Sequence, residues 1–404
     1  MKGAQAILET LYGAGVDTLF ANPGTSEMAL VRAMDDAGTV RAVLALFEGV
    51  VSGAADGYAR MAGRPAATLL HLGPGLANAG ANLHNARRAR SPVVNIVGEH
   101  AREHIALDAP LTTDIEAVAR PFSRWVRTIS TTAQAGPDTA AAIEAARALA
   151  GPATLIVPAD VAWSEGGIPA RVPAAAAPTQ PEVQRLDLTA DWLRRAGPRA
   201  LLLLGGGALS ARGVAAAARL AAATGARLAA ENFNVRMARG VGRPYLPKVP
   251  YVGAAAEAFL GDVEVLVLVE SRAPVNFFGY PGQRGTPVAA ATHVLTLAAP
   301  GEAGVEALEA LCAGLRAPVP AAPPAVARPE MPTGPLDASS LAATLACCLP
   351  EGAVLCDEAI TTRTALYELL SAAAPYDHLD LMGGAIGEGL PLATGAARGD
   401  PSRR

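Results

Sequence analysis

The sequence predicts an α/β protein made of parallel sheets, and three observations support this prediction. Short apolar runs such as AATLLHL (66–72) and SPVVNIVG (91–98) alternate with longer segments of helical periodicity. Two segments rich in proline and alanine, 170–187 and 317–335, interrupt this alternation and are typical of linkers. The chain has 404 residues, of which 51% are hydrophobic, so several cores are possible. We expect three consecutive α/β domains, over 1–168, 186–316 and 336–404.

The first domain is predicted from strands and helices that follow one another at short intervals. This rhythm is typical of a parallel sheet covered on both faces. RAVLALF (41–47) has no charge after Arg41 and is expected to be a buried strand. The expected helices cover 4–15, 26–38, 48–63, the eighties and 137–149, and the expected strands cover 17–24, 41–47, 66–72, 91–98 and 153–160.

The second and third domains repeat the pattern with fewer elements. Strands are expected in 199–204, 226–233, 262–271 and 292–299, and the third domain begins with a helix over 337–349. The glycines at 205–207 follow the first of these strands. A glycine turn there can approach a phosphate, but it is more often a tight strand–helix connection, since the full GxGxxG spacing is unclear.

Composition excludes several classes of function. The net charge of −4 gives no basic surface for nucleic acid, and no apolar run approaches the length of a membrane span. The N-terminus lacks a cleavable signal pattern. Four cysteines have no metal-ligand spacing and are expected to be buried thiols of a cytoplasmic protein: Cys312, Cys347, Cys348 and Cys356.

Glu48 is the first candidate functional residue, because it stands where an apolar strand ends and an apolar helix begins. Val51, Ala55 and Tyr58 lie on one apolar face of that helix. A carboxylate in apolar surroundings is disfavoured in its charged form, which makes Glu48 a candidate proton donor. The alternative is that Glu48 only complements the positive end of the helix.

The segments on either side of Glu48 carry a family resemblance. GAGVDTLFANPGTSE (13–27) and TLLHLGPGLANAGANLHNARRARSPVVNIVGE (68–99) resemble the pyrimidine-binding domain of thiamine-diphosphate enzymes, in the group of acetolactate synthase and benzoylformate decarboxylase. In that family a glutamate at this junction hydrogen-bonds a ring nitrogen of the aminopyrimidine and helps to activate the cofactor. Glu48 matches it. The resemblance also implies cofactor contacts from Pro23, Gly24 and Asn78.

The third domain resembles the start of the diphosphate-binding domain. The loop after its first strand contains Asp357, Glu358, Thr361 and Thr362, and the resemblance implies diphosphate contacts from the last three. Alternatively, Thr361 or Thr362 caps the following helix. In GGAIGEGLP (383–391), Gly384 matches the carbonyl that accepts from the aminopyrimidine and Ile386 matches the residue that bends the cofactor, although three glycines before a helix can also be a plain turn.

Substrate contacts are implied by three further segments. Thr25 and Ser26 could hydrogen-bond a substrate carboxylate, or Ser26 could cap the helix that follows. His71 matches the proton-relaying histidine of benzoylformate decarboxylase, whereas acetolactate synthases carry a small residue there. A structural histidine is the alternative. The loop APVNFFGYPGQ (273–283) offers Asn276 and Phe277 where the decarboxylase has a second histidine.

The family's metal motif, Gly-Asp-Gly followed by Asn, is absent from these 404 residues. No metal ligand is therefore assigned in this chain. The resemblance implies that the chain covers about two-thirds of a family member, and the Mg²⁺ ligands are expected in the missing C-terminal segment. The strand at HLDLMG (378–383) and its neighbours are then expected to have unpaired edges. The chain by itself is expected to bind thiamine diphosphate weakly or not at all and to turn over no 2-oxo acid.

The resemblance as a whole implies a thiamine-diphosphate enzyme acting on a 2-oxo acid, by decarboxylation with or without carboligation, as in acetolactate synthase. The alternatives are a benzoylformate-type decarboxylase and a fragment that cannot bind cofactor and only dimerises. We expect no FAD, a homodimer or homotetramer, and no nucleic-acid or membrane partner.

Overall fold

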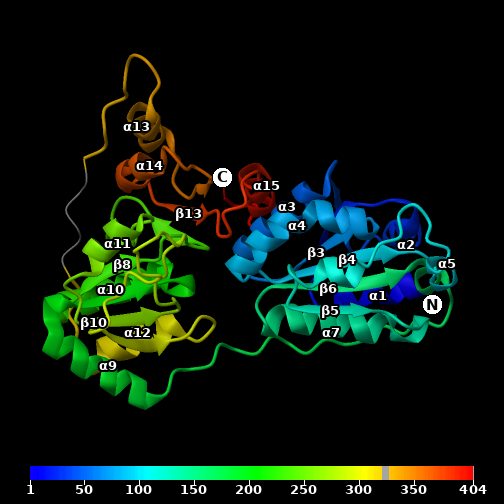
Figure 1. Cartoon of the computed structure of the whole chain (residues 1–404), viewed down its shortest axis with the longest axis horizontal. Helices are drawn as coiled ribbons and strands as arrows, with labels where there is room; N and C mark the ends of the chain where they lie inside the picture. The colour runs from blue at the N-terminus through cyan, green and yellow to red at the C-terminus, as the bar shows by residue number, and fades with distance from the viewer. Residues whose placement is uncertain (321–326, 404) are drawn as a thin grey trace. The chain divides into compact units, whose positions relative to one another are not determined.

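The computed structural model describes residues 1–320 and 327–403, so residues 321–326 of the second predicted linker lie outside the described part. The chain forms two compact units (Figure 1). The first comprises Met1–Ala176 together with Leu381–Arg404, and the second comprises Ala177–Asp380. The family-based domain boundaries remain predictions, and each unit is described by itself below.

The first unit contains a six-stranded sheet in the order β2-β1-β3-β4-β6-β5, with every pair parallel. This arrangement confirms the α/β class predicted from the alternating pattern. The strands are β1 (Thr18–Asn22), β2 (Arg41–Leu44), β3 (Ala66–Leu70), β4 (Val93–Glu99), β5 (Trp125–Thr128) and β6 (Pro152–Pro158).

Helices cover both faces of this sheet, because successive strand residues point to opposite sides. Leu19 of β1 packs into a core with one set of helices, α1 (Gly3–Gly13), α2 (Met28–Ala37) and α7 (Ala135–Ala148). Phe20 points the other way, into a core with α3 (Glu48–Ala62), α4 (Leu72–Ala89) and α6 (Ile115–Ala119). Short helices α5 (Arg102–Ile105) and α8 (Ala159–Trp163) follow β4 and β6.

The prediction that 41–47 is a buried strand is wrong. β2 is the edge strand of the sheet, with β1 as its neighbour. Leu44 is 71% exposed and Leu46 is 93% exposed. The apolar run therefore forms a strand whose outer side chains are not covered by this chain.

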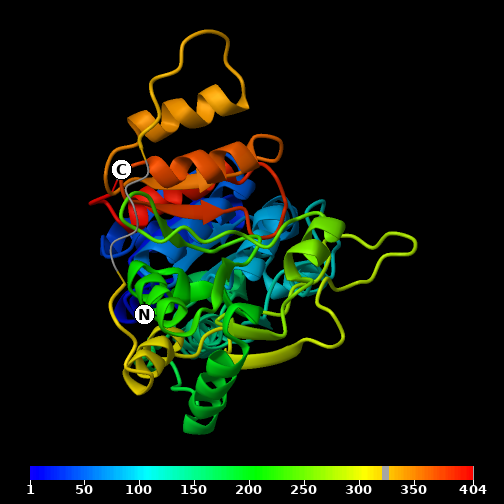
Figure 2. The same ribbon diagram turned by 90° about the vertical axis from the view of Figure 1, so that its left-hand side faces the viewer.

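The second unit begins with a parallel four-stranded sheet in the order β11-β10-β7-β8 (Figure 2). The strands are β7 (Ala200–Leu204), β8 (Arg227–Ala230), β10 (Val265–Val269) and β11 (His293–Ala298). Its helices are α9 (Val183–Ala196), α10 (Ala211–Thr224), α11 (Gly253–Leu260) and α12 (Gly304–Gly314). These strands lie in the four segments that the sequence predicted.

A three-stranded sheet in the order β12-β13-β9 completes the second unit. β12 (Val354–Asp357) is parallel to β13 (Tyr376–Asp380), and β9 (Met237–Arg239) pairs antiparallel with β13. Helices α13 (Ala338–Cys348, orange in Figure 2) and α14 (Arg363–Leu369) pack on this sheet through a small core. The expectation of unpaired edges is wrong for β13 itself, because β12 pairs with one of its edges and β9, from far upstream, with the other, whereas its neighbours β12 and β9 are the outer strands of this sheet.

The last helix, α15 (Gly389–Gly399), packs against α3 in the first unit (red and blue in Figure 1). No helix among the described residues is long and apolar enough to cross a membrane.

Candidate active site

Glu48 is the first residue of α3 and its side chain is held at the junction with α4. The residue is 7% exposed, and Asn78 donates a hydrogen bond from Nδ2 to its Oε2 at 3.0 Å. Gly75 of α4 lies so close that a Cβ there would be 2.8 Å from Glu48 Oε1. Glycine leaves room for this approach, and Asn78, a predicted cofactor contact, donates to the carboxylate.

Glu27 and His71 form a second pair at the carboxyl ends of the strands. His71 Nδ1 lies 2.7 Å from Glu27 Oε2, which also accepts from the backbone N–H of Gly24 at 2.7 Å. Glu27 is fully buried, and its Oε1 has no hydrogen-bond partner in the described structure. Burial raises the pKa of the Glu27 carboxyl. The pair can therefore hold and pass a proton.

The sequence interpretation assigned no role to Glu27. One local feature of the sequence does indicate a structural role for Glu27. An acid three residues after Gly24 has the spacing of a helix-start cap, and the Glu27 carboxylate does accept from the Gly24 amide. Its contact with His71, 44 residues away, carried no local signal. Leu72, next to His71, has a φ of +53°, a strained value for a branched residue beside a candidate site.

The loop before α2 places Gly24 beside His71, and the preceding Pro23 is half-buried. A Cβ on Gly24 would lie 2.4 Å from the imidazole ring, so glycine is required there. Thr25 is exposed and Ser26 half-buried. The alternative that Ser26 caps the next helix is wrong, because α2 begins at Met28 and has no side-chain cap.

The loop 383–388 is clamped by α4. His84 Nε2 lies 3.1 Å from the carbonyl oxygen of Gly383, and Asn85 Nδ2 donates to the carbonyl of Ala385 at 2.8 Å. The amide of Ala385 donates back to Asn85 Oδ1 at 3.2 Å. Gly384 has a φ of +78°, which favours glycine, and Ile386 is exposed. The loop predicted to hold the aminopyrimidine is thus fixed in the same unit as Glu48.

The predicted diphosphate residues lie in the second unit, after β12. Glu358 and Thr362 are half-buried and Thr361 is exposed. Thr362 immediately precedes α14, but its side chain makes no capping hydrogen bond, so the capping alternative does not hold for it. Asp357 is turned inward, with Oδ1 accepting from the amide of Ala359 at 2.8 Å.

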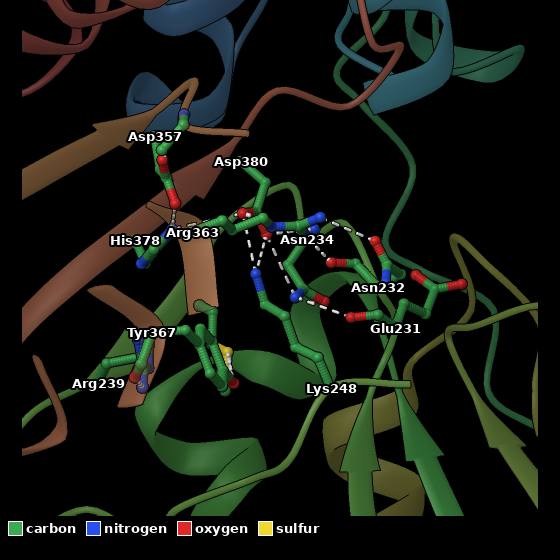
Figure 3. A network of polar contacts seen from close by, with 12 residues as sticks. Glu231, Asn232, Asn234, Arg239, Lys248, Asp357, Arg363, Tyr367, His378 and Asp380 are labelled. Atoms are coloured by element: carbon green, nitrogen blue, oxygen red, sulfur yellow. Dashed lines mark hydrogen bonds and ion pairs between the residues drawn. The ribbon is translucent and has the colours of Figure 1, made fainter. Parts of the chain in front are cut away.

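Asp357 belongs to a buried charge network with His378 and Asp380 (Figure 3). His378 Nε2 lies 3.2 Å from Asp357 Oδ2 and 3.4 Å from Asp380 Oδ1. Ligand atoms of these three residues lie within 4.8 Å of one another, a spacing that could hold a metal ion. However, Lys248 Nζ donates to both Asp380 oxygens, at 2.9 and 2.6 Å, and Arg363 is 3.7 Å away. Cations of the chain already neutralise Asp380, so we interpret the cluster as an ion-pair network.

Asn276 and Phe277 also lie in the second unit. Phe277 packs in an aromatic group with Tyr251 and Phe233, at ring-centroid distances of 4.9 and 5.8 Å. Asn276 Nδ2 donates to the carbonyl of Arg284, which fixes its loop. The structure therefore brings Glu48, His71, Asn78, the 23–26 loop and the 384–386 loop into one unit, and the remaining predicted residues into the other.

The glycine turn at 205–207 is filled by acidic side chains. The amide of Gly207 donates to Glu270 Oε2 at 2.9 Å. A Cβ on Gly205 would lie 2.5 Å from Glu231 Oε2, and one on Gly206 would lie 2.7 Å from Glu270 Oε2. The turn occurs beside the point where strand order reverses, between β7 and β10, which is where such sheets bind ligands. Carboxylates of the chain occupy the place of a phosphate here.

The chain resembles known proteins over its whole length. Residues 1–118 match a family described as the thiamine pyrophosphate enzyme N-terminal TPP-binding domain. The chain is 48% identical over 409 residues to IlvX of Mycobacterium tuberculosis H37Rv, whose name gives acetolactate synthase large subunit as a provisional assignment. That alignment covers all of this chain and 78% of IlvX.

Two decarboxylases are also similar. Benzoylformate decarboxylase of Pseudomonas aeruginosa is 36% identical over 121 residues, which is 30% of this chain and 22% of that protein. The structure of the thiamine diphosphate-dependent 4-hydroxybenzoylformate decarboxylase of Rhodococcus jostii RHA1 has a TM-score of 0.84 at 23% identity. It matches over all of this chain and 80% of that one, and shows that the fold is shared.

Proposed function

Because the chain belongs to the thiamine-diphosphate enzyme family, we propose that it acts on a 2-oxo acid, by decarboxylation with or without carboligation, as acetolactate synthase does. The observation that carries the proposal is Glu48. Its carboxylate is buried where β2 leads into α3, and Asn78 donates to it. We propose that it corresponds to the family's cofactor-activating glutamate, as the resemblance implies.

The residues of the first unit fit the aminopyrimidine end of thiamine diphosphate. Gly75 has no side chain beside the Glu48 carboxyl, and Asn78 donates to that carboxyl. We propose that Pro23, Gly24 and Asn78 contact the cofactor there. We propose that the carbonyl of Gly384 accepts a hydrogen bond from the aminopyrimidine and that Ile386 bends the cofactor. When bound, thiamine diphosphate supplies the carbon nucleophile that adds to a ketone.

At the diphosphate end we propose contacts from Glu358, Thr361 and Thr362. We assign no residue of this chain to Mg²⁺, since the one described cluster with suitable spacing, Asp357, His378 and Asp380, is paired internally.

The Glu27–His71 pair favours a second candidate, a benzoylformate-type decarboxylase that returns a proton to the product carbon. His71 Nδ1 is engaged by a buried carboxylate, which orients the ring and leaves Nε2 for proton transfer. Thr25 and Ser26 are proposed to bind the substrate carboxylate, and Asn276 and Phe277 to contact the rest of the substrate. In this candidate the product is an aldehyde.

The exposed residues around Glu48 support a homodimer or homotetramer. Leu44, Leu46, Phe47 and Val50 are all exposed large apolar side chains that flank the buried carboxylate. Several large apolar side chains left exposed within one short segment are typical of a surface covered by a second subunit. We propose that a second copy covers it.

The Glu270 carboxylate supports the absence of FAD from this enzyme. Glu270 accepts from the amide of Gly207, and also from those of Gly304 and Ala208, at the turn where a dinucleotide phosphate would lie. A phosphate would meet two carboxylates, Glu270 and Glu231, in this place.

The test uses a full-length version of the protein with thiamine diphosphate and Mg²⁺, and two variants. We expect Glu48→Gln to slow deuterium exchange at the thiazolium C2 by at least about 10²-fold with an unchanged circular dichroism spectrum. We expect His71→Ala to leave that exchange rate alone and to slow conversion of 2-oxo acids by about 10²–10⁴-fold. Normal exchange in Glu48→Gln contradicts the central assignment, and failure of the wild-type chain to bind cofactor by calorimetry favours the fragment that only dimerises.

A further inference from the structure

Glu388 is a buried acid that none of the proposed chemistry uses. It is fully buried at the start of α15, in the loop that His84 and Asn85 clamp. Asn85 Nδ2 donates to Glu388 Oε2 at 2.9 Å, whereas Oε1 has no hydrogen-bond donor in the described structure. Oxygens buried without a donor are costly, so Oε1 needs a proton of its own or a partner.

The neighbour of Glu388 is a second carboxyl group, Asp56 of α3. The side chains of Glu388 and Asp56 are in hydrogen-bond contact, which requires that one of them carry a proton. Asp56 is the charged member, because Arg60 grips both of its oxygens, from Nε at 2.9 Å and from Nη2 at 2.5 Å. Ser91 also donates to Asp56. The proton therefore resides on Glu388.

The groups facing this pair come from all elements packed against it. α3 supplies Asp56 and Arg60, and α4 supplies Asn85, a neutral donor. His84 of α4 contacts the backbone of the same loop at Gly383. One guanidinium thus faces two carboxyl groups, which leaves the site neutral only if Glu388 is protonated.

Water is excluded from the pair because α3 and α15 touch backbone to backbone. A Cβ on Gly57 would lie 1.9 Å from the carbonyl oxygen of Leu392, and one on Gly395 would lie 1.8 Å from that of Ala54. A Cβ on Gly53 would lie 2.7 Å from the Cβ of Pro391 and 3.5 Å from the Cγ of Glu388. Helices this close leave a dry environment in which a second ionised carboxylate is strongly disfavoured.

We propose that Glu388 is a positioning residue, whose protonated carboxyl donates to Asp56 and holds the 383–388 loop and α15 against α3, the helix that carries Glu48. Loss of that proton sets two carboxylates against each other and loosens the loop. The proposal rests on the proposed function only in saying that this loop serves a cofactor.

The sign of the pH dependence follows from burial. Burial, with the Asp56 charge, raises the pKa of Glu388 to about 9. The unfolded-state pKa of a glutamate is about 4.3, below the folded-state pKa of Glu388. The stability that such a carboxyl contributes is complete below the unfolded-state pKa and is lost as the pH rises toward the folded-state pKa. Docking of α15 is therefore strongest in acid and weakens up to about pH 9.

Two measurements on the cofactor-free chain test the proposal, so that they stand apart from any failure of the enzymatic assignment. Infrared difference spectra of wild type against Glu388→Gln should show one protonated carboxylic acid band at pH 7 that disappears with a midpoint near pH 9. Amide hydrogen exchange over 383–399 is expressed at each pH relative to the intrinsic, base-catalysed rate. Protection should fall as the pH rises in the wild type and should be nearly independent of pH in Glu388→Gln, whose amide donates to Asp56 at every pH.

Glu388→Ala is expected to show at least tenfold faster exchange over 383–399 at pH 6, and Glu9→Gln, an exposed acid on α1, serves as the matched control without effect. If the band is missing at pH 7, the proton is not on Glu388. If Glu388→Gln exchanges as fast as Glu388→Ala, the shared proton does not hold the loop. Either result overturns the proposal.

Discussion

Asp380 is expected to stabilise the second unit strongly, and Asp380→Asn is the perturbation that measures it. Its side chain is 2% exposed and accepts from Lys248 Nζ at 2.9 and 2.6 Å and from the amide of Asn234 at 2.7 Å. Asparagine keeps the shape and an acceptor for Asn234 but removes the charge. The Lys248 ammonium then remains buried next to Arg363 without its counter-ion. Removing one partner of a buried pair costs about 3–5 kcal/mol, and we expect that loss here.

The acid dependence of this contribution has a definite sign. Burial opposes the charge on Asp380, but Lys248, His378 and Arg363 outweigh it and hold the pKa well below its usual range. The contribution is thus present above the unfolded-state pKa of about 3.9 and is lost as the pH falls toward the folded-state pKa. The difference between wild type and Asp380→Asn should be constant from about pH 5 to 7 and shrink below about pH 4. It should also shrink toward pH 8, because burial lowers the pKa of Lys248 to about 8 and its ammonium then loses its charge.

The assay is urea unfolding followed by circular dichroism, with amide exchange in β9 and β13 to assign the transition to the second unit. Adding Lys248→Met to Asp380→Asn should restore most of the loss, since the uncompensated charge is removed. Asp36→Asn, in an exposed pair with Arg32, is the control and should cost less than about 0.5 kcal/mol. A loss under about 1 kcal/mol in Asp380→Asn, or no recovery in the double variant, would refute the reasoning.

Two further predictions concern close approaches of the backbone. Gly395→Ala places a methyl group 1.8 Å from the carbonyl oxygen of Ala54 and should destabilise α15 docking by about 1–3 kcal/mol, read as faster amide exchange over 383–399. Gly13→Ala, with open space around it, should be neutral or slightly stabilising. Glu270→Gly should free the amides of Gly207 and Gly304 and relieve the φ of +51° at residue 270. Calorimetry with ADP should then show binding that the wild type lacks, and equal behaviour of the two proteins would contradict the role given to Glu270.

Local patterns in the sequence determined most of the sheets and the central candidate residue. Alternating apolar strands and amphipathic helices predicted the parallel sheets, because burial on both faces of a sheet leaves continuous apolar runs. Glu48 was found for the same reason, since a strand that leads directly into a helix places the first helical residue at the edge of the sheet where ligands bind. The identity of the cofactor came from the family resemblance, because no spacing of residues by itself indicates thiamine diphosphate.

The tertiary structure decided which polar groups meet and which edges are covered. His71 with Glu27, and Glu388 with Asn85, are separated by 44 and 303 residues, so neither pair has a periodicity to detect. β9 has three residues, too few for a pattern, yet it covers the edge of β13. β2 has the composition of a buried strand and lies at an edge. Composition and periodicity indicate how a segment is buried on average. Contacts between residues distant in the chain depend instead on how whole elements pack, so they are seen only in the folded chain.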